Sequence, residues 1–270
     1  MKNLGLVIEP AELETLLHES SVIIVDLCKA KQYRNAHIPG AHFLNYADII
    51  RTKKPAMGLV PDDAHFSQLL SKLGITADTH VIAYDDEGGG CASRFIWTLH
   101  VFGHSRASLL NGGLFSWANE GHALTRDVPE SRASDYRLTN TGDYTVDSAY
   151  IMQHLDDEHT VLLDARSLPE YSGTKNFAHR GGHIPGARHY EWTEAMDRSN
   201  NLRLLPAASI LQKLDQIGIT KDREVIVYCQ THHRSAFSYV MLRSLGYENV
   251  KAYPGSWSEW GNRDDTPVER

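Results

Sequence analysis

The chain has 270 residues, of which 41% are hydrophobic and 23% charged, a composition typical of globular proteins with one large or two ordinary domains. The net charge of −7 argues against nucleic acid as a partner, which needs a basic surface, although it leaves room for a local basic pocket. No apolar run approaches the roughly 18–20 residues of a membrane-spanning helix, and the N-terminus lacks a secretory signal, so we expect a cytoplasmic protein without a membrane partner.

Strands and helices are expected to alternate along the first half of the chain. A proline starts the first helix and Gly103 follows the last one, as is typical of helix ends. The strands are apolar without strict alternation, which indicates a parallel sheet covered on both faces. In chain order, the predicted elements are a helix at Pro10–Glu19, a strand at Ser21–Asp26, a helix at Asp62–Leu73, a strand at His80–Tyr84, a helix at Arg94–Phe102 and a strand at Ala107–Leu110.

The second half of the chain repeats the first. The segment Ala36–Ala41 (AHIPGA) returns as Gly182–Ala187 (GHIPGA), so that His37 and His183 are 146 residues apart. The strand that ends before Asp85 returns 144 residues later, before Cys229. Landmarks in the same order at a nearly constant offset indicate two copies of one domain.

We therefore predict an α/β fold of two tandem domains, each a mainly parallel sheet flanked by helices. The first domain is expected at residues 1–125 and the second at residues 145–270. The polar segment 126–144, rich in Ser, Thr, Asn and Asp, is interpreted as the linker. In the second domain the expected helix at Ser235–Leu245 ends before Gly246.

The three cysteines are Cys28, Cys91 and Cys229, and no pair of them has the C-x-x-C spacing of a zinc site or a redox dithiol. We predict no metal and no disulfide framework. For Cys28 and Cys91 a buried apolar role is expected. Cys229 differs because it follows the predicted central strand at Val225–Tyr228, and ligands of open parallel sheets bind at the carboxyl ends of the strands.

The loop after Cys229 predicts a nucleophilic site. A short loop between a strand and a helix turns its backbone N–H groups inward, and the helix N-terminus adds a positive dipole end. Both stabilise a thiolate, so the pKa of Cys229 should lie below that of a free cysteine. The alternative is a buried strand-end cysteine beside a solvated turn. The candidate substrate-binding residues of this loop are Gln230, Thr231, His232, His233, Arg234 and Ser235.

The first copy provides an internal comparison. Asp85 stands at the position of Cys229, and its loop carries the further acids Asp86 and Glu87 where the second copy has polar and cationic residues. We expect this loop neither to stabilise a thiolate nor to attract an anion. The first domain should therefore be catalytically inactive.

On these motifs the chain resembles the two-domain rhodaneses. The loop Cys-Gln-Thr-His-His-Arg-Ser and the segment Gly255–Asn262 are similar to those of bacterial thiosulfate sulfurtransferases in particular. The resemblance implies a double displacement, in which Cys229 takes sulfane sulfur from thiosulfate as a persulfide and passes it to a thiophilic acceptor, cyanide in the usual assay. No cofactor is implied. Arg166 and Arg180 would bring positive charge to the donor, and Asp164 would support the loop.

Other functions stay open at this stage. One alternative donor is 3-mercaptopyruvate, which related enzymes use. In another alternative, this protein is a sulfur carrier that passes its persulfide sulfur to a protein partner. Cysteine phosphatases use a similar loop, but they place five residues between Cys and Arg, whereas four separate Cys229 from Arg234. The shorter loop favours a single sulfur atom over a phosphate. We interpret His37 and His183 as structural residues, since one of them lies in the inactive copy.

Overall fold

The computed structural model describes residues 4–270, which divide into two compact units. Unit 1 comprises the chain up to Ile49 with Pro61–Thr141 and Met196–Leu204, and unit 2 comprises Ile50–Val60, Gly142–Ala195 and Leu205–Arg270. Each half of the sequence thus gives one short segment to the unit built by the other half. The domain boundaries expected at 125 and 145 stay a prediction. No helix within residues 4–270 is long and apolar enough to cross a membrane.

Unit 1 is built on a five-stranded parallel sheet with the strand order β1-β7-β6-β2-β3. Helix α4 packs on the central strands β6 and β7. The strands are β1 (Val7–Ile8), β2 (Val22–Asp26), β3 (Ala41–Phe43), β6 (His80–Tyr84) and β7 (Ala107–Leu110). The helices are α1 (Pro10–Glu14), α2 (Ala30–Asn35), the 3₁₀ turn η1 (Tyr46–Ile49), α3 (Asp63–Lys72), α4 (Gly90–Val101) and α5 (Gly113–Asn119).

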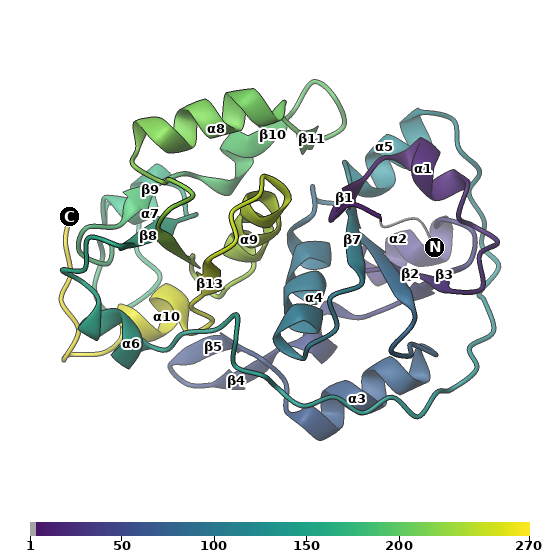
Figure 1. The fold of residues 1–270 in the computed structure, drawn as a ribbon, viewed down its shortest axis with the longest axis horizontal. Coiled ribbons are helices and arrows are strands. Elements are labelled where there is room, and N and C mark those ends of the chain that lie inside the picture. Colours follow the sequence, from purple (N-terminus) through teal and green to yellow (C-terminus); the bar gives the residue numbers. More distant parts are fainter. Residues whose placement is uncertain (1–3) are drawn as a thin grey trace. The chain divides into compact units, whose positions relative to one another are not determined.

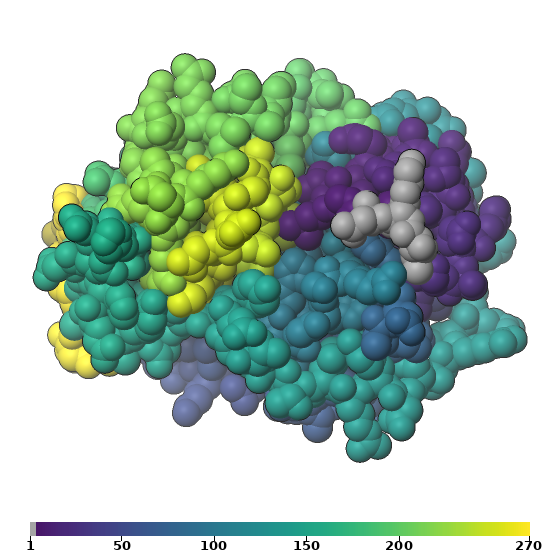
Figure 2. Space-filling model, viewed as in Figure 1, coloured from purple at the N-terminus to yellow at the C-terminus, as the bar shows by residue number. Residues whose placement is uncertain are grey.

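Unit 2 has a four-stranded parallel sheet with the order β13-β12-β8-β9. Helix α9 packs on β12 and β13, and α8 lies at the surface (Figures 1 and 2). The strands are β8 (Thr160–Asp164), β9 (Arg188–His189), β12 (Glu224–Tyr228) and β13 (Val250–Ala252). The helices are α6 (Ser148–Gln153), α7 (Leu168–Tyr171), the 3₁₀ turn η2 (Trp192–Ala195), α8 (Ala207–Gln216), α9 (Arg234–Ser244) and α10 (Ser256–Trp260).

The predicted α/β class with parallel sheets is confirmed, and strands β6 and β7 have the predicted bounds. Helices α3 and α9 differ from the predicted bounds by one residue at each end, and α1 and α4 differ by more. The first ends at Glu14 rather than Glu19 because the following residues form turns. Helix α4 begins at Gly90 rather than Arg94, because Gly88 and Gly89 take the positive φ angles of 96° and 102° that let the loop turn early into the helix.

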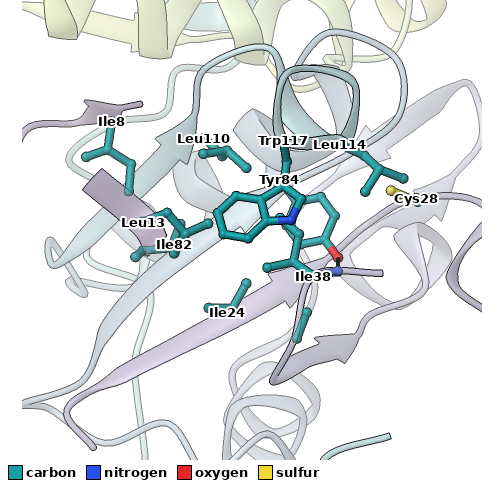
Figure 3. Close-up of a cluster of buried hydrophobic side chains, with 11 residues drawn as sticks. Ile8, Leu13, Ile24, Cys28, Ile38, Ile82, Tyr84, Leu110, Leu114 and Trp117 are labelled. Atoms are coloured by element: carbon teal, nitrogen blue, oxygen red, sulfur yellow. Dashed lines mark hydrogen bonds between the residues drawn. The ribbon is translucent and has the colours of Figure 1, made fainter. Parts of the chain in front are cut away.

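The repeated HIPGA segment is fixed to the central strand in the same way in both units. In unit 1 the Tyr84 hydroxyl, within a core that also contains Trp117, accepts a hydrogen bond of 3.1 Å from the Ile38 N–H (Figure 3). In unit 2 the Tyr228 hydroxyl accepts one of 3.2 Å from the Ile184 N–H. Each tyrosine directly precedes Asp85 or Cys229, so the HIPGA turn holds the end of that strand.

The two histidines of this motif are packed into the fold. The ring of His37 stacks on Tyr33 at 3.9 Å, and that of His183 stacks on Tyr171 at 3.7 Å. In each case Nδ1 lies within 2.9 Å of the carbonyl oxygen of the stacked tyrosine. Both rings are buried, which is consistent with the structural role expected for them.

Each exchanged segment is a β-hairpin that packs on the loop after the central strand of its unit. In unit 2, β4 (Arg51–Lys53) and β5 (Ala56–Leu59) lie beside α10 (Figure 1), and the Met57 N–H donates to the Ser258 hydroxyl at 3.2 Å. In unit 1, β10 (Met196–Asp197) and β11 (Arg203–Leu204) form the equivalent hairpin, with the Met196 side chain against Gly88. The sequence did not predict either hairpin.

Candidate active site

Cys229 lies directly after β12, which pairs with β8 and β13 in the middle of the sheet. The residue is 1% exposed. Its carbonyl accepts a hydrogen bond of 2.9 Å from the Trp257 N–H, and its N–H donates to the Ser256 hydroxyl at 3.4 Å. In unit 1 the Asp85 carbonyl accepts the equivalent bond, 3.0 Å long, from Leu114. The repeat detected in the sequence is therefore preserved at individual backbone bonds.

Ser256 is a buried site residue that sequence reasoning missed. Its φ of 52° is left-handed, where glycine is favoured, and glycine occupies the equivalent position, Gly113, with a φ of 56°. Such a conformation costs a non-glycine residue on the order of 1 kcal/mol or more. The Ser256 hydroxyl also donates a hydrogen bond of 2.9 Å to the Tyr253 carbonyl. A serine at the place of Gly113 in the repeat was the available signal.

The loop from Gln230 to His233 curls around the Cys229 sulfur. His232 has a φ of 54° and occupies the place of Gly88, three residues after the strand-end residue. Its buried ring lies 2.8 Å from the Ser235 hydroxyl through Nδ1. This contact fixes the loop, so His232 is brought to the site as a buried support of the turn.

The environment of Cys229 favours the thiolate. Burial by itself would raise the pKa of the thiol, but the positive charge of Arg234, the Ser235 hydroxyl and the N–H groups of Ser235 and Thr231 lower it more. The net result is a pKa below the ordinary value, the direction predicted from the sequence. By contrast, burial and nearby Asp85 or Asp26 carboxylates raise the pKa of Cys91 and Cys28. A nucleophile therefore forms more easily at Cys229 than at either of them.

Arg234 is held at the start of α9 by a residue far away in the sequence. Its guanidinium donates two hydrogen bonds, of 2.7 and 2.8 Å, to the Glu170 carboxylate. Burial opposes ionisation of Glu170, yet the bonds from Arg234 and Ser167 bring its pKa down to about 2. Sequence reasoning missed Glu170, although Ser167 and Glu170 have the spacing of a capping box at a helix start.

Arg166 and Asp164 form a buried ion pair beneath the sheet end. Nη2 of Arg166 lies 2.6 Å from the Asp164 carboxylate and 2.7 Å from the Gly182 carbonyl, and its guanidinium stacks over Trp257 at 4.5 Å. The Arg166 side chain is 1% exposed. It is thus committed to its own unit, and a contact with the donor, as the family resemblance implied, is not supported by this geometry.

Arg180 is likewise turned toward the C-terminal segment. Its Nη1 donates to the Thr266 carbonyl at 2.6 Å, and its Nη2 donates to the Trp260 carbonyl at 2.9 Å. The structure does not bring Arg180 into the loop around Cys229. Among the arginines named from the sequence, Arg234 has the main effect on the sulfur, because its positive charge lowers the pKa of Cys229.

Three further loop residues lie around this turn. Gln230 and Thr231 are half-buried, and the Gln230 amide donates a long bond of 3.4 Å to the Phe177 carbonyl. The His233 ring lies against Trp192 with 5.6 Å between ring centroids. The substrate-binding role of these three side chains stays a prediction.

The loop of unit 1 is occupied by the carboxylate of its own residue Asp85. This carboxylate accepts hydrogen bonds from the N–H groups of Glu87, Gly89 and Ala92 at 3.1, 2.8 and 2.9 Å. Burial, with a smaller effect of Glu87, raises the pKa of Asp85 to about 6. The backbone N–H groups of both loops therefore stabilise an anion. The residue after the strand determines its kind, a carboxylate at Asp85 or a thiolate at Cys229.

The raised pKa of Asp85 predicts a pH dependence of stability. Because its pKa is higher in the folded chain than in the unfolded one, its effect favours folding below pH 4 and is lost as the pH rises through 6. The loss is on the order of 3 kcal/mol, since each pKa unit is worth about 1.4 kcal/mol. In Asp85→Asn this slope should disappear from melting temperatures measured between pH 4 and 7. Asp135→Asn, at an exposed site of unit 1, should keep it.

Replacing Arg234 should raise the pKa of Cys229. We expect Arg234→Gln to shift the pH profile of the reaction of Cys229 with thiosulfate upward by about one unit, so that the rate at pH 6 falls about tenfold. The control is Arg243→Gln on the same helix, whose guanidinium binds the carbonyl groups of Tyr247 and Glu248. Equal profiles for wild type and Arg234→Gln would contradict the role given to this charge.

Gly58 should be required for the shape of the loop. A Cβ atom at this position would lie 2.0 Å from the Thr231 carbonyl oxygen, so Gly58→Ala must displace either β5 or the loop. We expect sulfur uptake by Cys229 to slow at least tenfold, by analogy with other misplaced catalytic groups. Gly5→Ala, with its nearest contact at 3.2 Å, is the control. Normal uptake in Gly58→Ala, with an unchanged urea midpoint, would refute the prediction.

Comparison with known proteins places the chain in one family. The rhodanese-like domain family matches residues 9–120 and 147–263. A thiosulfate sulfurtransferase of Pseudomonas aeruginosa is 45% identical over 267 residues, 99% of this chain and 98% of that protein. The sulfur carrier protein TtuD of Thermus thermophilus is 33% identical over 257 residues, 88% of this chain and 87% of that protein. The crystal structure of YnjE has the same fold, with a TM-score of 0.89 at 23% identity over 98% of this chain and 69% of that one. The chain therefore belongs to the rhodanese family and contains two rhodanese-like domains, as the resemblance of its motifs had indicated.

Proposed function

We propose that this protein is a thiosulfate sulfurtransferase that carries sulfur on Cys229. The proposal is based on the buried Cys229 thiol, whose pKa is lowered by Arg234, Ser235 and the surrounding N–H groups. The 45% identity to a thiosulfate sulfurtransferase along the whole chain supports the same donor. The protein would act in the cytoplasm, without a cofactor.

The reaction has two displacements. The Cys229 thiolate attacks the outer sulfur of thiosulfate. The sulfur–sulfur bond of the donor breaks, and sulfite leaves with the bonding electron pair. Cys229 is then a persulfide anion, which the N–H groups of Thr231 and Ser235 can stabilise as they stabilise the thiolate. A thiophilic acceptor such as cyanide attacks the outer sulfur, and the Cys229 thiolate is released. Ping-pong kinetics are expected.

Intact mass after treatment with thiosulfate tests the mechanism. The wild type should gain one sulfur atom, about 32 Da, and lose it on addition of cyanide, as a covalent intermediate requires. Cys229→Ala should gain nothing. A gain in this variant would make Cys28 or Cys91 the carrier and would contradict the proposal.

The donor and the final acceptor need a separate comparison. Treatment with 3-mercaptopyruvate would form the same persulfide, so the ratio of kcat/KM for the two donors decides between them. The likeness to a sulfur carrier protein favours transfer to a protein as the second candidate function. Turnover of an aryl phosphate at a rate comparable to that of thiosulfate would overturn both in favour of a phosphatase.

A further inference from the structure

Two buried polar side chains contact each other beside Cys229. The Nδ1 atom of His232 lies 2.8 Å from the Ser235 hydroxyl, and the same hydroxyl forms a hydrogen bond with the Cys229 sulfur. All three residues are at most 1% exposed, so water does not compete for these bonds. A continuous hydrogen-bonded path therefore leads from the reactive sulfur to an imidazole ring within unit 2.

The hydrogen atoms of this path have one consistent direction. The Ser235 hydroxyl carries a single hydrogen, and its bond with the sulfur favours the thiolate, so the hydroxyl donates to Cys229. The hydroxyl oxygen must then accept the bond of 2.8 Å from His232, which requires a proton on Nδ1. The network therefore assigns the tautomer of the ring, in which Nδ1–H donates to Ser235 and Ser235 donates to the sulfur.

The backbone of His232 has a conformation that glycine adopts more easily. Its φ of 54° is left-handed, and Gly88 occupies the same place in unit 1 with a φ of 96°. Among non-glycine residues, histidine is one of the few that are enriched in this region. Because a glycine would form the turn without strain, the imidazole ring at this place is consistent with a role beyond shaping the loop.

The loop of unit 1 has the same backbone bond but lacks the two side chains. The N–H of Ala92 donates to the Asp85 carboxylate at 2.9 Å, as the N–H of Ser235 bonds to the sulfur. Ala92 has no hydroxyl, and Gly88 has no ring. A carboxylic acid ionises readily, whereas a free thiol has a pKa of about 8.5. The two side chains thus occur in the loop whose anion is harder to form.

We propose that Ser235 is a catalytic residue and that His232 is its positioning residue, joined to Cys229 in a hydrogen-bond relay. The catalytic part of this inference rests on the proposed function of Cys229. His232 holds the Ser235 hydroxyl with its hydrogen toward the sulfur, where it stabilises the thiolate before attack and again when the thiolate is released. No proton crosses the relay in either step, since the thiolate is both the attacking and the leaving group. Without the ring, the hydroxyl can rotate toward other acceptors.

The residues of unit 1 supply the variants that test the relay. Ser235→Ala and His232→Gly introduce the side chains that unit 1 has at these places, so the loop is expected to fold. Alkylation of Cys229 by iodoacetamide, followed by the mass of its peptide across pH, measures the thiolate without a sulfur donor. At pH 6 we expect Ser235→Ala to react about tenfold more slowly, the usual effect of losing a hydrogen bond to a charged group. His232→Gly should react about fivefold more slowly, because it keeps the hydroxyl but not its direction.

The shape of the pH profile separates this role from a structural one. The relay acts on the fraction of thiolate, so both variants should reach the rate of the wild type at the alkaline plateau. An equal loss at every pH would mean that the loop is displaced, and it would overturn the proposal. Ser238→Ala, one turn further along α9, is the control for Ser235→Ala because its buried hydroxyl has no hydrogen-bond partner.

Two further variants test the connection between the residues. In the double variant of Ser235→Ala with His232→Gly, the loss at pH 6 should stay near tenfold, because His232 acts only through Ser235; a loss of about fiftyfold would mean independent effects and would contradict the relay. His232→Asn should stay within about twofold of the wild type, since the amide nitrogen can take the place of Nδ1 and asparagine tolerates a left-handed backbone. A loss in His232→Asn as large as that in His232→Gly would also contradict the relay.

Sulfur uptake from thiosulfate separates the relay from the proposed function. The same variants should lose the same factors in the rate at which Cys229 forms its persulfide. A wild type whose alkylation responds to these changes, but which takes up no sulfur from thiosulfate, would refute the proposed function and leave the relay as a property of the thiol. Unchanged alkylation profiles in both single variants would overturn the relay and leave the persulfide mechanism intact.

Discussion

The constraint on which the structure depends is the burial of an anion at the end of a central strand. Both loops turn their N–H groups toward the side chain that follows the strand, Asp85 in unit 1 and Cys229 in unit 2. An unpaired N–H group buried there would be costly, so an acceptor at the centre stabilises the loop. In unit 1 the carboxylate is a permanent acceptor. In unit 2 the acceptor is the Cys229 sulfur, whose lowered pKa favours the nucleophilic thiolate.

The balance of charge differs between the two strand-end residues, Asp85 and Cys229. Burial disfavours ionisation at both positions. Glu87 adds to that cost for Asp85, while Arg234, Ser235 and the N–H groups of the loop together more than offset it for Cys229. Arg234 can do so because Glu170 holds its guanidinium in place. The polar contacts that stabilise the Cys229 thiolate thus extend beyond the loop to Glu170 in α7, 64 residues from Arg234 in the sequence.

The sequence was informative wherever the signal is local or repeated. The repeat predicted that the strand end at Cys229 differs from the one at Asp85, and the run from Cys229 to Ser235 predicted a turn that lowers the pKa of the thiol. The ion pair of Arg234 with Glu170 could not be predicted, because neither residue forms a periodic pattern and the two are distant in the chain. Arg166 was assigned to the donor by resemblance, but its side chain is buried on Asp164, a geometry that composition and spacing do not reveal. The predicted bounds of α1 and α4 were wrong, because turns rather than apolar spacing determine where these helices end or begin.

The exchanged hairpins show how the first half of the sequence contributes to the surroundings of the Cys229 loop. Residues Ile50–Val60 lie in the first half of the sequence, yet they belong to unit 2, where Gly58 packs on the Thr231 backbone and Met57 bonds to Ser258. The second half alone would keep Cys229 with its charges but would lack this wall of the loop. The first half of the sequence therefore contributes part of the packing that shapes the Cys229 loop.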